Sequence, residues 1–361
     1  MKFRPIFLFN IIILAFLLTA CSGRAMQQSS WPGLSVGQDT AYVAYHQHVY
    51  AVDLKSGTEI WRYPAQPDAK KSFYAPPQLS EDGQLLVASY DSNLYSLNPS
   101  NGQENWSFTD STNHYIGSPL AAPSAIYAPS SDNNLYAIDY TGKSFWTAPF
   151  TTDSPLWAQP ATDDTCECVY LTSMDHQVYA LNATNGSLIW ETPDLGGAIA
   201  GSPVLDDNGK LFVGTFNNEL LALSTQNGQT IWKFPTQNWV WSGPALVNDI
   251  LYFGDIDGNF YAINASSGSE LWNFKVDGAI LSTPLVTTDQ IYITTDTGLL
   301  YALDKSGQPV FNRTIGLTLH APAVAAGDLI LVAPGDQENL IVAIHPDGSQ
   351  VWSFNPEPSK K

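Results

Sequence analysis

The sequence predicts an all-β chain that folds as an eight-bladed β-propeller of four-stranded antiparallel blades. One segment recurs eight times: a Tyr or aliphatic residue, Ala or Ser, an apolar residue, usually Asp or Asn, then a spacer, Gly and an aromatic ring. Successive rings lie 39 to 45 residues apart, close to the roughly 40 to 50 residues of a propeller blade. The repeats carry period-two alternation and turn residues, which exclude a solenoid of helices. The eight ring positions are Trp61, Trp106, Trp146, Trp190, Trp232, Trp272, Phe311 and Trp352.

Length and composition fit one propeller rather than several domains. A propeller takes up all 361 residues without one thick core, because its blades repeat radially. Charged residues make up 14% and aromatic residues 12% of the chain, so apolar surface is ample for the contacts between blades. We expect a monomeric propeller over residues 31–354 and a polar tail at 355–361. Eight self-contained blades and a strand exchange at the seam both remain open.

The N-terminus has the features of an export signal. Lys2 and Arg4 precede an apolar run from Ile6 to Leu18, which is shorter than the roughly 20 residues of a membrane span. Leu18-Thr19-Ala20-Cys21 resembles the bacterial lipobox, and the resemblance implies a signal peptide at 1–20, cleavage after Ala20 and a diacylglycerol, with acyl chains such as palmitate, on the Cys21 thiol. A polar tether would follow at 21–30. The alternative is ordinary secretion with cleavage nearby.

The same resemblance implies a location in the bacterial cell envelope. No Asp follows Cys21 directly, so in a cell with two membranes the family sorting rule favours the outer membrane, with the protein facing the periplasm. In a cell with one membrane the protein would sit on the outer face of the cytoplasmic membrane.

The chain is strongly acidic. After removal of residues 1–20, 13 Lys and Arg remain against 34 Asp and Glu, a formal charge of −21. Such a field repels phosphate backbones and anionic lipid headgroups, which argues against nucleic-acid binding and electrostatic membrane docking. Membrane attachment is therefore expected through the lipid alone.

Blade five shows the expected strands most clearly. They are the inner strand at 202–205, the second at 211–215, the third at 220–223 and the outer at 230–234, each short, apolar and bounded by turn formers. Two-residue turns such as Asn217-Asn218 are expected between second and third strands, because Asn, Asp and Gly tolerate positive φ. The repeated Gly reverses the chain before the outer strand for the same reason. The aromatic ring should then pack between blades, over the small Ala.

The repeat resembles the tryptophan-docking motif of the pyrroloquinoline-quinone (PQQ) type propellers, Ala-x-Asp-x-x-x-Gly-x-x-x-Trp. The resemblance covers residues 38–354 and implies a quinoprotein-like propeller. This chain departs from the motif at Ser224, His345 and Phe311. The spacers of the third, seventh and eighth copies are also short, so we expect those interfaces to be less regular.

The resemblance also makes a PQQ-dependent enzyme a candidate function. The PQQ dehydrogenases hold the quinone over the channel with calcium, a catalytic Asp and typically a disulfide between adjacent cysteines. No adjacent cysteine pair exists in this sequence, and blades of about forty residues leave no insertions for a cofactor chamber. We therefore predict no catalytic residue and no cofactor, with PQQ and calcium as a disfavoured alternative.

Three further patterns are interpreted as structural. Asp255-x-Asp257 faintly resembles a calcium loop, but it lacks the downstream Glu and falls on a hairpin turn. His46 and His48 could offer imidazoles to a metal, but no third ligand is identifiable and a surface pair is expected, so no metal is predicted. Cys166 and Cys168 are a possible disulfide clamping a hairpin, with two free thiols as the alternative.

A candidate binding face follows from strand geometry. The turn between second and third strands and the connection into each inner strand lie on one face of the propeller. Three residues before each inner-strand Pro, that face should carry an apolar and aromatic ring at the channel mouth, formed by Tyr74, Ile116, Trp157, Ala200, Trp241, Leu281 and Leu319, with Tyr115 and Trp239 nearby. Acidic turns should surround it, at Asp91, Asp132, Asp175, Asp257, Asp296 and Asp336. The alternative is that the rings only plug the channel and seal the joints between blades.

Lipid anchoring, eight short blades and no catalytic constellation resemble the propeller lipoproteins of the outer-membrane β-barrel assembly machinery. That resemblance implies a non-enzymatic scaffold that holds an assembly factor or client protein through loops on one face. A ligand-binding or sensory envelope lipoprotein is the first alternative. A PQQ-dependent dehydrogenase is the second.

Overall fold

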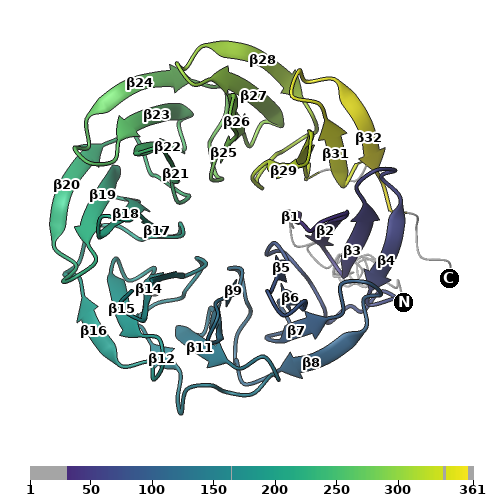
Figure 1. The fold of residues 1–361 in the computed structure, drawn as a ribbon, viewed down its shortest axis with the longest axis horizontal. Helices are drawn as coiled ribbons and strands as arrows, with labels where there is room; N and C mark the ends of the chain where they lie inside the picture. Colours follow the sequence, from purple (N-terminus) through teal and green to yellow (C-terminus); the bar gives the residue numbers. More distant parts are fainter. Residues whose placement is uncertain (1–30, 164, 336–338, 357–361) are drawn as a thin grey trace, which may run out of the picture. The chain divides into compact units, whose positions relative to one another are not determined.

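Eight four-stranded antiparallel sheets are arranged in a ring in the computed structural model of the chain (Figure 1). The structure describes residues 31–163, 165–335 and 339–356. Each sheet consists of four consecutive strands, with the first strand innermost and the fourth on the outer rim. The predicted fold class is confirmed. Among the described residues, no helix is long and apolar enough to cross a membrane.

The strands of the eight blades follow one another in chain order. Blades one to four consist of β1 (Gly33–Val36), β2 (Thr40–Tyr45), β3 (His48–Asp53), β4 (Glu59–Tyr63); β5 (Gln78–Leu79), β6 (Leu85–Ala88), β7 (Leu94–Leu97), β8 (Glu104–Phe108); β9 (Leu120–Ala121), β10 (Ile126–Pro129), β11 (Asn134–Ile138), β12 (Phe150–Thr151); β13 (Ala161–Asp163), β14 (Cys168–Thr172), β15 (Val178–Asn182) and β16 (Leu188–Glu191). Blades five to eight consist of β17 (Val204–Leu205), β18 (Lys210–Thr215), β19 (Glu219–Ser224), β20 (Thr230–Pro235); β21 (Ala245–Val247), β22 (Ile250–Gly254), β23 (Asn259–Asn264), β24 (Glu270–Lys275); β25 (Leu285–Val286), β26 (Gln290–Thr294), β27 (Leu299–Asp304), β28 (Pro309–Thr314); β29 (Val324–Ala326), β30 (Leu329–Val332), β31 (Ile341–Ile344) and β32 (Gln350–Phe354).

The turn between second and third strands has the two residues expected in blade one, where Tyr45 pairs with His48, but it is longer in blades two to seven. In blade five, Thr215 still pairs with Glu219, so the turn has three residues and ends at Asn218 with a φ of 59°. A three-residue hairpin turn commonly closes with one left-handed residue, which explains why a single Asn or Gly suffices. In blade seven that residue is Gly298, so the expected pair Asp296-Thr297 lies one residue too early.

Each aromatic ring docks on the repeated Gly of the next blade. A Cβ atom on Gly102 would lie 2.5 Å from the Trp61 ring, and one on Gly268 would lie 2.8 Å from the Trp232 ring. The Gly therefore serves two needs at once, because it also adopts positive φ at the turn. The expected place for the ring is confirmed as well, since Ala222 lies directly across the strand pair from Trp232.

A hydrogen bond accompanies this packing. The indole Nε1–H donates to a main-chain carbonyl of the next blade, at 2.8 Å from Trp190 to Thr225 and at 3.1 Å from Trp232 to Ala265. The carbonyls that accept from the seven docking tryptophans belong to Pro99, Tyr140, Ala183, Thr225, Ala265, Lys305 and Leu54. These contacts tie each blade to its neighbour by a buried ring and one polar bond.

Of the three copies with short spacers, which were expected to be irregular, two differ from the rest. Trp146 lies outside the outer strand of blade three, which is reduced to β12, although its ring still packs on Gly186. Phe311 has no N–H to donate; instead Arg313 Nη1 donates to the carbonyl of Gly348 at 2.5 Å, across the same interface. The eighth copy is regular, so the expectation of irregularity there was wrong.

The ring closes without strand exchange. The first blade is β1–β4 and the last is β29–β32, so no strand crosses the seam. Trp352 packs on Gly57 and donates from Nε1 to the carbonyl of Leu54 at 2.9 Å. Tyr50 and Phe354 add an edge-to-face contact with ring centroids 5.7 Å apart. The seam is therefore an ordinary blade interface, and the core lies between blades all round the ring.

The cysteine and histidine pairs lie near turns. Cys166 and Cys168 form a disulfide at the turn before β14. His48 is 7% exposed, and its Nδ1 lies 2.8 Å from the carbonyl oxygen of Pro64, so the expectation of a surface His46–His48 pair was wrong for His48. The signal peptide, the tether and Cys21 lie outside the described residues, as do Asp336 and positions 357–361 of the tail.

Replacing the docking Gly should cost more than replacing another left-handed Gly. Gly83 has a φ of 84° with open space around it, whereas Gly268 has a φ of 71° and contacts Trp232. We expect Gly83→Ala to lower the free energy of unfolding by about 1 kcal/mol through left-handed strain. Gly268→Ala should add about 1–3 kcal/mol from overpacking. Guanidinium unfolding of both variants measures the difference, and equal midpoints would contradict the docking role.

Candidate functional site

The candidate site is the connection face, defined as the face that holds the turns between second and third strands and the connections into each inner strand. Main-chain bonds join the two kinds of segment. The Ile256 N–H donates to the carbonyl of Trp239 at 3.0 Å, and the Phe216 N–H donates to that of Ala198 at 2.9 Å. The turn of one blade thus fixes the connection that precedes it in sequence.

One residue of each connection between described blades lies in the core. Its N–H donates to the carbonyl of the residue that begins the turn, as from Val240 to Thr215 and from Leu319 to Thr295. Tyr115 takes this position as well, through its bond to Ser89, and both Tyr115 and Leu319 are buried. Their expected place at the channel mouth was therefore wrong.

The next residue in each connection occupies an equivalent position beside the channel, and in six of the eight blades it lines the channel cavity. These residues form the channel ring: Trp31, Tyr74, Ile116, Trp157, Ala200, Trp241, Leu281 and His320. Trp31 contacts Tyr74 and His320 edge-on, with ring centroids 5.7 and 6.2 Å apart, so the ring is continuous across the seam. Six of its members, Ile116, Trp157, Ala200, Trp241, Leu281 and His320, line a cavity of about 390 Å³ in the channel.

Counting from proline missed two members of the channel ring. In blade eight, Pro322 stands one position earlier in the strand than the other prolines, which made Leu319 appear equivalent to Leu281 in place of His320. Trp31 precedes the first copy of the repeat and has no proline at the usual distance. The pairing of the first and second strands identifies the members of the channel ring correctly. Each member lies four residues before the inner-strand residue that has the same place in this pairing in every blade.

Two aromatic stacks extend from the channel ring onto the connection face. In the Trp239 stack, Phe216 lies between Trp239 and Trp241, with centroids 4.9 and 5.1 Å away and ring planes 9° and 25° apart. In the Tyr90 stack, Tyr90 lies 4.2 Å from Tyr74 and 4.4 Å from His114. Trp239 is 43% exposed, so one ring of its stack is largely open to solvent while Phe216 holds it in place.

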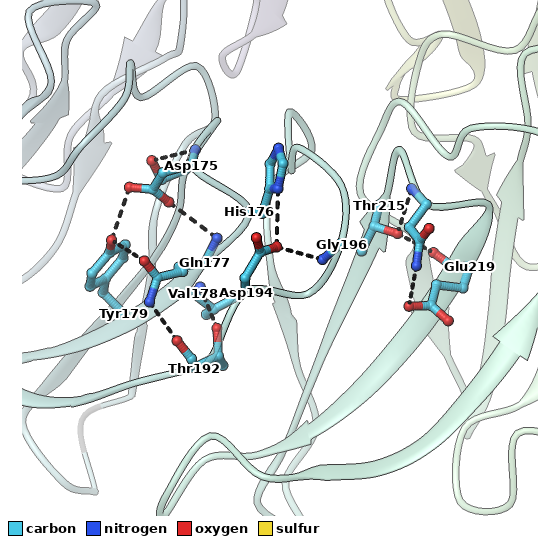
Figure 2. Close-up of polar contacts among 12 residues, drawn as sticks. Asp175, His176, Gln177, Val178, Tyr179, Thr192, Asp194, Gly196, Thr215 and Glu219 are labelled. Carbon is cyan, nitrogen blue, oxygen red and sulfur yellow. Dashed lines mark hydrogen bonds and ion pairs between the residues drawn. The ribbon is translucent and has the colours of Figure 1, made fainter.

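The acidic turns hold tyrosines of the third strand. Figure 2 shows the turn of blade four, where the Asp175 carboxylate accepts hydrogen bonds from the Tyr179 hydroxyl at 2.9 Å and the Gln177 N–H at 3.1 Å. Burial and this carboxylate together raise the pKa of Tyr179 above its usual value of 10.0. The same bond joins Tyr95 to Asp91, Tyr136 to Asp132 and Tyr261 to Asp255.

The other acidic turns bond to the connections. Asp257 accepts from the Asn238 side chain at 3.0 Å, and Asp296 accepts from the Ala279 N–H at 2.7 Å. The carboxylates expected around the channel mouth therefore brace the loops as well as giving the face negative charge.

A histidine and a carboxylate meet beside this turn. The Nδ1 atom of His176 lies 3.0 Å from Oδ1 of Asp194, and the Gly196 N–H donates to the same oxygen at 2.7 Å (Figure 2). The Gly196 N–H and the His176 side chain hold the pKa of Asp194 below its usual range. Both side chains are solvent-accessible, and they fix the connection from blade four to blade five.

The residues present do not fit a calcium-bound quinone. No three His, Cys, Asp or Glu side chains among the described residues gather as a metal site. The channel ring has no carboxylate, and the disulfide joins Cys166 and Cys168 at a first-to-second strand turn, on the face away from the connections. Among the described residues, neither a set of calcium ligands nor a disulfide lies at the channel mouth.

Comparison with known proteins adds a family and several folds. The family model of "Outer membrane protein assembly factor BamB" matches residues 45–238, 174–274 and 221–353. A search of curated proteins found no sequence match.

Three solved structures of similar fold illustrate the range. BamB from Moraxella catarrhalis superposes with a TM-score of 0.71 and 17% identity, over 88% of this chain and 94% of that one. The computationally designed Ika8 protein gives 0.72 and 14%, over 91% and 97%. A europium-containing methanol dehydrogenase gives 0.69 and 15%, over 83% and 81%. Identities this low show a shared fold alone.

The buried tyrosines predict an alkaline limit to stability. Folding raises the pKa values of Tyr95, Tyr136, Tyr179 and Tyr261 above 10.0, so their contribution is complete below about pH 10, the pKa of a free tyrosine, and is lost as the pH rises further. Absorbance at 295 nm should show these tyrosines ionising together with unfolding. The change Tyr179→Phe should reduce the steepness of the loss. Reversible ionisation near pH 10 with the fold intact would contradict this assignment.

Proposed function

The chain belongs to the family of outer membrane protein assembly factor BamB, and on that premise we propose that it is a non-enzymatic propeller scaffold that binds protein partners at the bacterial cell envelope. The observation that carries the proposal is the Trp239 stack, an exposed and braced aromatic anchor on the connection face of a propeller of this family. A partner in outer-membrane protein assembly, such as a membrane β-barrel assembly factor, is the occupant that the family favours.

The connection face has the chemistry of a protein interface. Exposed aromatic residues dominate binding energy when they are held rigidly, because little side-chain entropy is lost on association. Phe216 and Trp241 give Trp239 that rigidity, and Leu317, 76% exposed, adds apolar surface on another connection of the same face. The turn carboxylates around them favour a partner with basic side chains.

We place the scaffold at a membrane through its N-terminus. The lipobox-like sequence ending at Cys21 supports lipid attachment after removal of residues 1–20, and a tether at 21–30 leads to Trp31 of the channel ring. In a cell with two membranes the propeller would hang from the outer membrane into the periplasm. The charge of −21 makes the lipid, rather than the propeller surface, the membrane contact.

A ligand-binding lipoprotein is the second candidate, and the channel cavity favours it. Its volume of about 390 Å³ and the two indole rings in its wall, those of Trp157 and Trp241, suit a small molecule. A quinone is not the ligand that its residues suit, because the channel ring offers no carboxylate for calcium.

Site-directed crosslinking tests the connection face. A photoreactive residue at position 239 should capture an envelope protein in native membranes, whereas one at position 231 should not. Ile231 is a matched control, because it is 48% exposed but lies on the outer strand β20. Mass spectrometry of the adducts identifies the partner. Equal capture at both positions would contradict a role for the face.

Removing the anchor should weaken the complex. We expect Trp239→Ala to lower affinity about thirtyfold, corresponding to a hot-spot loss of about 2 kcal/mol, while Ile231→Ala leaves it unchanged. Co-purification and titration against the captured partner measure this. A small molecule retained in the channel of a protein that captures no partner would favour the second candidate instead.

Lipid attachment is tested at Cys21. Mass spectrometry of the mature N-terminus should find a diacylglyceryl group on this residue. The variant Cys21→Ala should lack the modification and should leave the membrane fraction. A Cys21→Ala protein that stays membrane-bound in the absence of its partner would show that the anchor lies elsewhere.

A further inference from the structure

A second cavity lies on the face opposite the connection face, between blades six, seven and eight. Its volume is about 680 Å³. The turns after β21, β25 and β29 form its mouth, where Asn248, Thr287 and Gly327 line it. This size suits a small ligand or the end of a peptide.

The wall of this cavity is mainly apolar. Ile250 and Tyr252 come from blade six, and Leu285 and Val286 come from blade seven. An apolar group that enters would therefore exchange water for aliphatic and aromatic contacts.

Lys305 is the one charged side chain among the described residues that line the cavity. Its Nζ lies 5.7 Å from the centroid of the Tyr252 ring, and no described carboxylate lies within 4.0 Å of it. Burial lowers the pKa of this ammonium group. Lysine in such a position gains from an anionic partner.

Lys305 differs in charge from the residues at the equivalent position of the other blades. Its main-chain carbonyl accepts the bond from Trp272 Nε1 at 3.2 Å, so the docking contact fixes where its side chain begins. The residues that accept the same bond in the other blades are all uncharged: Leu54, Pro99, Tyr140, Ala183, Thr225 and Ala265. Docking needs only a carbonyl, so it does not explain a lysine here.

Three carboxylates stand next to the lining residues and oppose an anion. Asp249 is occupied, since its oxygens accept from Asn264 at 3.2 Å and from Ser266 at 3.1 Å. Asp289 acts on Lys305 from beyond ion-pair distance, and Asp328 is on an exposed turn. None of the three lines the cavity, so Lys305 is the charged side chain that a ligand inside the cavity would contact.

We propose that this cavity binds an apolar carboxylate, with its apolar part against Ile250, Tyr252 and Val286 and its carboxylate on Lys305. The carboxylate could belong to a free acid or to the C-terminus of a peptide. This site is separate from the connection face and does not depend on the proposed function.

Calorimetry on the full chain in lipid nanodiscs tests the proposal. The probes are 4-phenylbutyrate, the tripeptide acetyl-Ala-Ala-Leu with a free carboxylate, and the amide of each. We expect at least one acid to bind and its amide to bind at least about tenfold more weakly, because the amide loses the charge-assisted bond. Binding of one acid only would identify the source, and binding of both would show that the cavity reads the shared group.

Variants at Lys305 separate the site from the surface. Lys305→Met should abolish the preference for acid over amide, and Lys305→Arg should keep it. Lys143→Met, at the corresponding turn of blade three, should bind as the unmodified protein does. Thermal unfolding confirms that each variant is folded, since the docking bond uses only the main chain. Equal binding of acid and amide, binding unaffected by Lys305→Met, or no binding at millimolar concentration would each overturn the proposal.

Discussion

The docking of an aromatic ring on the glycine of the next blade is the contact on which the rest of this structure depends. It needs three local features at once: a left-handed residue without a side chain, a small residue opposite the ring, and a carbonyl placed to accept from the indole. Trp232, with Gly268, Ala222 and Ala265, shows all of them. Because these features recur in the repeats, with Phe311 as the described docking ring that lacks the indole bond, the interfaces are specified blade by blade, and the ring needs no other device to close.

This constraint also separates structural residues from available ones. The docking residues and the strand cores are committed to the interfaces, so any binding chemistry must come from residues that differ between repeats. The stacked Trp239 and the partly buried Lys305 are two such departures, on opposite faces. The carboxylates of the turns do not belong to the same class. Their bonds to Tyr95, Tyr136 and Tyr179 show that they mainly hold the strands in place.

The fold could be read from the sequence because its determinants are short-range and repeated. Trp and Gly within one copy are four residues apart, and eight copies outweigh a defect such as Phe311. The site was harder to place because it depends on register. Because Pro322 lies one position earlier than the other prolines, counting from it predicted the buried Leu319 in place of His320, which faces the channel. Trp31 was missed because no copy of the repeat precedes it. The burial of His48 was not predicted either, because it comes from a contact with Pro64 that no local sequence pattern indicates.

The self-contained blades have a consequence for how such a chain could be rearranged. Since no strand is shared across the seam between Phe354 and Gly33, the junction of blades eight and one is held by side chains in the same way as the other junctions. The natural ends of the propeller are therefore topologically arbitrary. A circular permutant that opens any other connection and joins the present ends by a linker would keep every sheet intact, and whole blades could be gained by duplication without breaking a hydrogen-bonded ladder.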